Sequence, residues 1–194
     1  MFFGALLVGM AVAGPPAGAE QTVVEHNCTF YKGPRHSSGF DRVTAICHWP
    51  ELQPDHVNTI LSDVSRHAGL FSTVESVRLI GEHNGRQLSR QVHVASGLSD
   101  REIVLQHWVS QHGDATRHNW LIHTPQPAST MDLVVPDYDE GYWAVSAHPR
   151  GGSKVHFDLV YAPGGLVPKF VVNRFQTSGV VDMVGHFRRY LQNN

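Results

Sequence analysis

Hydrophobic and polar residues alternate along most of the chain, with a period of two that is typical of half-buried β-strands. The Asn84-Gly85 pair predicts a tight hairpin turn. The strand that follows it has an apolar face interrupted by Arg90 and an opposite polar face that carries Gln91 and His93. We predict eight strands: about 22–32, about 41–49, a segment through Val77 and Leu79, 88–94, 103–110, 119–123, 142–147 and 155–161.

Two segments follow the 3.6-residue period of an amphipathic helix. The first begins near Pro54 and has apolar residues at 57, 60, 61 and 64. The second runs from about 168 to 191, a rod of about 36 Å, and can therefore lie along a whole sheet. Sheets of this many strands curl, and one helix does not fill the concave side. We predict an α+β fold in which a curved antiparallel sheet wraps around a long C-terminal helix and leaves an apolar cavity.

The first nineteen residues have the pattern of a signal peptide. Residues 2–13 are mostly apolar, Gly14-Pro15-Pro16 ends the apolar run, and Ala17-Gly18-Ala19 offers the small-x-small pattern of a cleavage site. We expect cleavage after Ala19 and a soluble exported domain of residues 20–194. The alternative is a disordered or buried apolar N-terminus.

Cys28 and Cys47 are the only cysteines of the chain and lie in neighbouring predicted strands. An exported protein can keep a disulfide, and a hairpin would bring the two strands side by side. A bridge that closes this loop is worth about 3 kcal/mol. Two unpaired buried thiols are the alternative, and two cysteines alone are a poor basis for a metal site.

Composition and charge exclude several classes of protein. Of the 194 residues, 41% are hydrophobic and 16% are charged, which excludes a disordered chain, a coiled coil and a collagen-like fibre. The net charge of −2 offers no basic surface to phosphate backbones, so we expect no nucleic-acid partner. No apolar run reaches the roughly 18 residues that a membrane-spanning helix needs.

Three segments carry motifs of a known family. Residues 57–77 look like a first helix and the bend after it, and residues 99–105 (S-D-R-E-I-V-L) resemble an S-D-R-D-x-V-x segment that opens a central strand. Residues 163–168 (P-G-G-L-V-P), followed by Val172-Asn173, resemble the P-G-G-x-I-P…V-N start of a closing helix and are the most specific match. In these motifs and in its order of elements, the chain resembles the START family of lipid-transfer domains, within the helix-grip (SRPBCC, Bet v 1-like) superfamily.

The resemblance implies that the domain binds a lipid, sterol or other apolar small molecule, without turnover and without a cofactor. We also expect a monomer that contacts membranes transiently. Burial of apolar ligand area contributes about 25 cal/mol per Å², and a few polar groups orient the ligand. We expect the ligand site to be lined by Arg90, Trp143, Val155, Phe157, Leu159, Val172, Gln176, Val180, Met183 and Phe187. Each apolar residue of this set can equally belong to the solid core.

Arg90 and Gln176 stand out because they interrupt apolar rows. A buried guanidinium is costly unless it is paired. Arg90 is therefore expected either to meet a polar group of the ligand, or to reach solvent or pair with an acid of the protein. We expect Asp100 and Arg101 to make structural polar contacts where their strand begins.

Fourteen histidines raise the question of a metal site. His107 and His112 are five residues apart and point to opposite faces of a continuous strand. The same holds for His118 and His123, and no H-E-x-x-H or C-x-x-C motif occurs. A cross-strand cluster of His93, His107 and His123 is the remaining alternative. Exposed surface histidines are the simpler account.

Two other functions are compatible with the same scaffold. A polyketide cyclase or aromatase needs an acid–base pair that faces the cavity. His107 and His123 are the nearest candidates, but no carboxylate partner is evident in the sequence. A purely structural module would instead have large side chains that plug the space beneath the closing helix.

Overall fold

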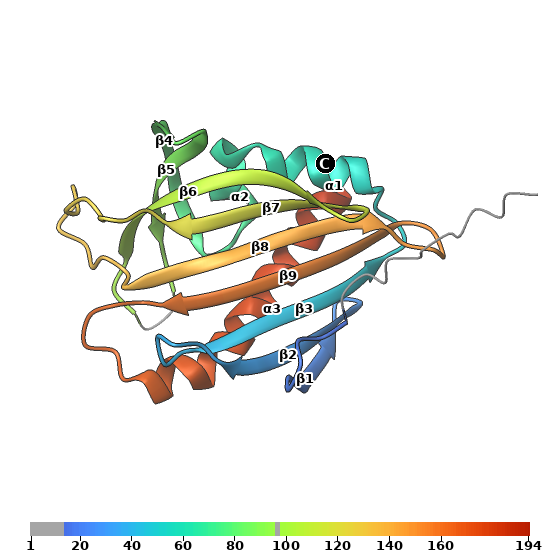
Figure 1. The fold of residues 1–194 in the computed structure, drawn as a ribbon, viewed down its shortest axis with the longest axis horizontal. Helices are drawn as coiled ribbons and strands as arrows, with labels where there is room; N and C mark the ends of the chain where they lie inside the picture. Colours follow the sequence, from blue (N-terminus) through green and yellow to red (C-terminus); the bar gives the residue numbers. More distant parts are fainter. Residues whose placement is uncertain (1–13, 96–97) are drawn as a thin grey trace, which may run out of the picture.

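One curved antiparallel sheet forms most of the molecule in the computed structural model, which describes residues 14–95 and 98–194 (Figure 1). Its nine strands lie in the order β1-β2-β3-β9-β8-β7-β6-β5-β4. The last strand therefore joins the N-terminal strands to the rest of the meander. The strands are β1 Glu20–Glu25, β2 Cys28–Arg35, β3 Asp41–Trp49, β4 Val74–His83, β5 Arg86–His93, β6 Arg101–His112, β7 Ala115–Ile122, β8 Tyr138–Ala147 and β9 Ser153–Ala162.

The helices lie on one side of this sheet. The long α3 (Lys169–Asn193) runs along it, as Figure 1 shows, and contacts β2, β3 and α2. The helix expected near Pro54 is α1 (Pro54–Ser62), which is followed by a short 3-10 helix (Val64–Arg66) and α2 (His67–Leu70). The expected α+β architecture, with a curved antiparallel sheet and a long C-terminal helix, is confirmed. Within the described ranges, no helix combines the length and the apolar character that crossing a bilayer requires.

The sheet has nine strands rather than the eight expected, because residues 22–32 do not form one strand. The chain turns at His26 and Asn27, which both have left-handed backbone conformations (φ 54° and 58°). Two consecutive residues with positive φ are typical of the tight turn that suits a two-residue hairpin. Glycine often marks such a turn, but none occurs here. The sequence therefore gave no sign of the break between β1 and β2. The expected turn at Asn84-Gly85 does form, with φ values of 52° and 72°.

The solid core lies beneath the C-terminal half of α3. Val180, Val184, Phe187 and Leu191 are buried there at helical spacing and pack against α1, α2 and the inner face of the sheet. This pattern is the apolar stripe of an amphipathic helix facing a core. The C-terminal half of α3 is thus held by packing.

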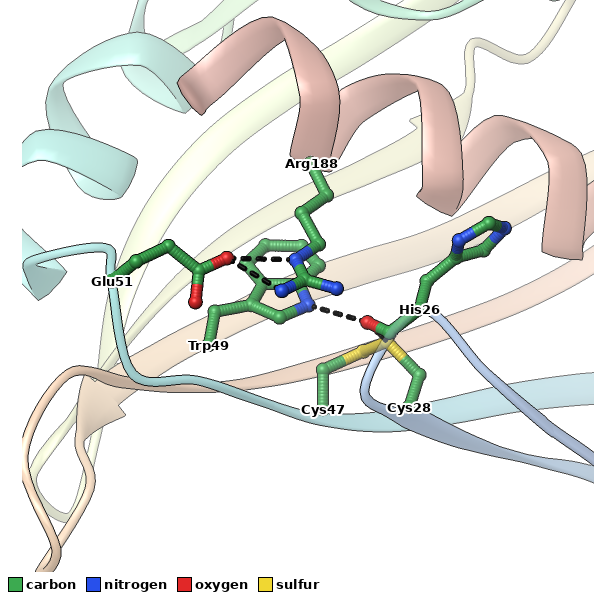
Figure 2. The surroundings of a disulfide bond; sticks show 6 residues. All are labelled: His26, Cys28, Cys47, Trp49, Glu51 and Arg188. Carbon is green, nitrogen blue, oxygen red and sulfur yellow. Dashed lines mark hydrogen bonds and ion pairs between the residues drawn. A yellow bond between two sulfur atoms is a disulfide. The ribbon is translucent and has the colours of Figure 1, made fainter. Parts of the chain in front are cut away.

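A disulfide joins Cys28 to Cys47 at directly opposed positions of β2 and β3. Figure 2 shows its surroundings: the Trp49 indole N–H donates to the backbone oxygen of His26 over 3.2 Å, and Arg188 of α3 pairs with Glu51 at 2.7 Å. These contacts join the β1–β2 turn, the end of β3 and α3. Residues 1–13 of the expected signal peptide lie outside the described residues.

The two family-like motifs after residue 98 contact each other. The Arg101 guanidinium donates from Nε to the carbonyl oxygen of Pro163 over 3.2 Å and from a terminal nitrogen to that of Ser99. Asn173 accepts a hydrogen bond of 3.1 Å from the backbone N–H of Asp41. The motif residues therefore attach the start of α3 to β3 and β6, and Arg101 has the structural role expected of it.

Candidate functional site

A cavity of about 1170 Å³ lies between the sheet and the N-terminal half of α3. This volume slightly exceeds the usual range of small-molecule sites, about 300–1,000 Å³. Its walls come from β4 to β9, from the end of α1, from α2 with the turn after it, and from α3. Exposed residues such as Glu82, Val109 and Gly179 also line it, so the cavity opens to solvent. The side chains of the described residues do not fill the space beneath α3, whereas a purely structural module would need that space filled.

Seven of the ten residues expected in the ligand site line this cavity: Trp143, Phe157, Leu159, Val172, Gln176, Val180 and Met183. The aromatic side chains form a wall in which the Trp143 and Phe157 rings lie 4.4 Å apart. The side-chain amide of Gln176 is buried, and neither its oxygen nor its nitrogen has a hydrogen-bond partner in the described part of the chain. The cavity wall is therefore largely apolar but includes an amide able to bind a polar group.

The other three expected residues do not line the cavity. Val155 and Phe187 are fully buried in the solid core. Arg90 lies 3.2 Å from Glu102, so it pairs with an acid of the protein. Burial favours the neutral form of Glu102, but hydrogen bonds from Thr130, its neighbour Ser129 and Arg90 outweigh this effect and lower its pKa to about 2. The carboxylate of Glu102 therefore compensates the charge of Arg90, and no ligand group is needed to pair with it.

Strand β5 turns its polar face, not its apolar face, toward the cavity. Ser89 and Gln91 are buried, and Gln91 and His93 line the cavity, whereas Val92 is buried on the other face. The outer face is covered as well, because the loop after β7 bonds to β6 there, with Thr130 bonded to Glu102. Because both faces of β5 are covered, the apolar row of this strand could not show which face turns toward the cavity.

Four histidines line the cavity, which corrects the expectation that the histidines are exposed. They are His67 on α2, His93 on β5, His107 on β6 and His118 on β7. Burial lowers the pKa of His67, His93 and His118 to about 4 and that of His107 to about 3. All four are therefore neutral at pH 7. The sequence signal for His93 was the polar row of β5, because residues that alternate along a strand share one face.

A chain of hydrogen bonds links the polar residues of β5 and β6. His93 Nε2 lies 2.9 Å from Gln91 Oε1, Gln91 Nε2 donates to Ser89 Oγ over 2.9 Å, and Ser89 Oγ lies 2.8 Å from His107 Nε2. Buried polar groups that are bonded in this way avoid the cost of lost hydration. The chain fixes the side chains that face the cavity.

Asp139 is a buried carboxyl group in the cavity wall that sequence reasoning missed. It is 3% exposed and accepts a hydrogen bond of 2.7 Å from the indole N–H of Trp120. Burial raises its pKa to about 7. Tyr161 is its direct partner on β9, and burial raises the pKa of that phenol too. With a pKa near 7 this carboxyl group is partly protonated at neutral pH, and its protonated form can donate a proton or a hydrogen bond to a bound molecule.

The cross-strand metal site at His93, His107 and His123 does not form. His123 is absent from the cavity wall and lies 3.3 Å from the side-chain amide of Gln106. Across residues 14–95 and 98–194, no group of three or more His, Cys, Asp or Glu side chains is arranged to hold a metal ion.

Comparison with known proteins identifies the fold. No protein-family model matches the chain, and no curated protein matches its sequence. A STAR-related lipid transfer protein from Xanthomonas axonopodis has a similar structure, with a TM-score of 0.78, 16% identity, and 90% of this chain and 99% of that chain covered. Human StAR-related lipid transfer protein 5 has a TM-score of 0.80 and 12% identity, with 92% and 88% covered.

A third similar structure is the di-domain ARO/CYC StfQ of the steffimycin biosynthetic pathway. Its TM-score is 0.53 and its identity 10%, with 77% of this chain and 48% of that chain covered. At these identities the likeness concerns the fold. The chain has the START-like helix-grip fold.

Proposed function

We propose that this domain binds a lipid, sterol or other apolar small molecule in the cavity beneath α3 and shields it from water. The open cavity of about 1170 Å³ with its aromatic and aliphatic wall is the observation that carries this proposal. Each 100 Å² of apolar ligand area buried there contributes about 2.5 kcal/mol. The lipid-transfer proteins among the similar structures support the same function.

Native mass spectrometry of protein purified from its own compartment, followed by solvent extraction, tests the proposal. We expect a bound apolar molecule in the wild type. A Gly179→Trp variant should retain at least tenfold less, because Gly179 lines the cavity and has open space where a side chain would begin. Gly69→Trp is the matched control, since Gly69 has the same open space but does not line the cavity. A wild type that carries no lipid and retains none from a lipid panel contradicts the proposal.

We propose further that the domain is exported as a monomer and touches membranes at the start of α3. Leu166 is fully exposed and Phe170 is 74% exposed, while the adjacent Val167 and Val171 line the cavity. An exposed apolar pair beside a lipid cavity is suited to contact with a bilayer. Co-sedimentation with phosphatidylcholine vesicles should fall in a Leu166→Ser/Phe170→Ser variant. It should be unchanged in Val24→Ser, where another exposed apolar residue lies on β1.

A cyclase or aromatase is the second candidate function. Asp139 favours it, because this buried acid has a pKa near 7 and shares the cavity with His107. A group that titrates near the working pH suits general acid–base catalysis. Incubation with a poly-β-ketone thioester would then give a cyclised, dehydrated product, and Asp139→Asn would abolish its formation without releasing bound lipid. Absence of this product with the wild type would leave binding as the function.

A further inference from the structure

Three of the cavity histidines come from separate elements and meet at the end of the cavity next to α1 and α2. The rings of His67 and His107 lie in a T-shaped arrangement with centroids 5.7 Å apart. His118 lies on β7, where it pairs with Val109, two residues beyond His107 on β6 and on the same inner face. All three histidines line the cavity.

Hydrogen bonds show which nitrogen carries the proton in two of these rings. His67 Nε2 lies 3.4 Å from the backbone oxygen of Leu61, and His118 Nε2 lies 2.9 Å from Asn58 Oδ1. Both partners are oxygens that only accept, so Nε2 is the donor in each ring. A neutral imidazole has a single N–H. The Nδ1 atoms of His67 and His118 are therefore acceptors, and that of His118 is buried without a partner among the described residues.

The third ring has the opposite arrangement. His107 Nε2 lies 2.8 Å from Ser89 Oγ and 3.4 Å from Gln91 Nε2, which can only donate. A protonated Nε2 would set two donors against each other at the Gln91 contact, so the arrangement in which all these contacts are hydrogen bonds has Nε2 as an acceptor from the Ser89 hydroxyl and from Gln91 Nε2, which also donates to Ser89 Oγ. His107 therefore carries its proton on Nδ1. No hydrogen bond in the described part of the chain uses this Nδ1 donor.

The described residues of the cavity wall also offer no free positive charge to an anionic ligand. Among the described residues that line it, Arg101 is the only arginine or lysine, and its guanidinium donates to the backbone oxygens of Pro163 and Ser99. Burial keeps the histidines neutral, with the pKa of His67 and His118 near 4 and that of His107 near 3. A charge buried without a partner is strongly unfavourable. A phosphate or carboxylate group would thus be poorly accommodated here.

We propose that His67, His107 and His118 form a hydroxyl-recognition site, and that the ligand is an uncharged lipid alcohol. A hydroxyl accepts from the Nδ1–H of His107 and donates to the bare Nδ1 of His67 or His118. A methyl ether in its place accepts but cannot donate, and a carboxylate brings a charge that faces two acceptors. This inference rests on the proposed function and specifies the chemical class of its ligand.

A set of probes of equal chain length tests this site in delipidated protein. Native mass spectrometry at pH 7 would measure the binding of 1-hexadecanol, its methyl ether and palmitate, each delivered from cyclodextrin. We expect the wild type to bind the alcohol about tenfold more tightly than either of the others, the effect of about one unmade hydrogen bond. His107→Phe should reduce this ratio to about one. His123→Phe, at a histidine outside the cavity wall, should leave the ratio unchanged.

The outcomes separate this inference from the function on which it rests. If none of the three probes binds, lipid binding itself is contradicted. If the wild type binds the ether or palmitate as tightly as the alcohol, the hydroxyl site is wrong although the cavity binds lipid. A ratio that persists in His107→Phe also overturns it. If that variant does not fold, Ser89→Ala replaces it, because loss of the Ser89 hydroxyl frees His107 Nε2 and should lower the same ratio.

Discussion

Two residues one turn apart on α3 should differ sharply in what their truncation costs. Phe187 is fully buried, and its ring centroid lies 4.9 Å from that of Trp143, 5.4 Å from Phe71 and 5.8 Å from Trp49. Met183 is only partly buried and lines the cavity. Both belong to the apolar stripe of the helix, so the sequence alone does not distinguish them.

The magnitudes follow from what surrounds each side chain. Phe187→Ala removes a fully packed ring and leaves a new void, which costs about 4 kcal/mol. For a chain of this length, that loss corresponds to a fall in Tm of about 10 °C. Met183→Ala enlarges a cavity that already exists and loses contacts on one side only, so we expect about 1 kcal/mol. Alanine is a good helix former at both positions, so helix propensity does not create the difference.

Urea denaturation of delipidated protein measures both values. The wild type and the two variants should share one m-value and differ in the midpoint, which shows that only stability has changed. Met183→Ala should weaken lipid binding although it lowers the free energy of unfolding only slightly, because Met183 lines the cavity. If the two variants lose the same free energy of unfolding within about 1 kcal/mol, the distinction between core-filling and cavity-lining positions on α3 is refuted.

Three other predictions concern the stability of the domain. The 19-residue separation of Cys28 and Cys47 implies that a Cys28→Ala/Cys47→Ala variant loses about 3 kcal/mol in urea denaturation; an unchanged midpoint would show that the bridge does not stabilise the fold. The pKa of His67, His93 and His107 falls from 6.5 to about 3–4 on folding, so only the unfolded chain binds these protons and stability should fall as pH drops from about 6.5 toward 4. Asp139 has the opposite effect: its pKa is raised to about 7 on folding, so its contribution to stability falls as pH rises from about 4 through 7. Asp139→Asn should therefore make the free energy of unfolding fall more steeply as pH drops from about 7 to 5, and a shallower fall would contradict the assignment. Finally, a Cβ at Gly141 would collide with the backbone oxygen of Asp158 and the ring of Trp120, so Gly141→Ala should cost about 3 kcal/mol by thermal unfolding, whereas Gly69→Ala, with open space around it, should cost little.

Local periodicity in the sequence was enough to predict most elements of this fold. The helical spacing from Pro54 and the long final stripe predict α1 and α3, and α3 begins at Lys169 and ends at Asn193, close to the expected 168–191. Alternation located the strands, because neighbouring side chains of a strand must point to opposite faces. The turn at His26 and Asn27 was missed, since it depends on backbone conformation without the glycine that usually marks it.

The sequence by itself determined which residues share a face of each element. This was enough to predict a long amphipathic helix that packs on a curved sheet. Only the tertiary structure decided what each face meets. Arg90 faces Glu102 under a distant loop, Gln91 faces the cavity, and Phe187 fills the core while Met183 borders open space. Periodicity is a property of neighbours along the chain, whereas core, cavity and loop are made by segments far apart in it.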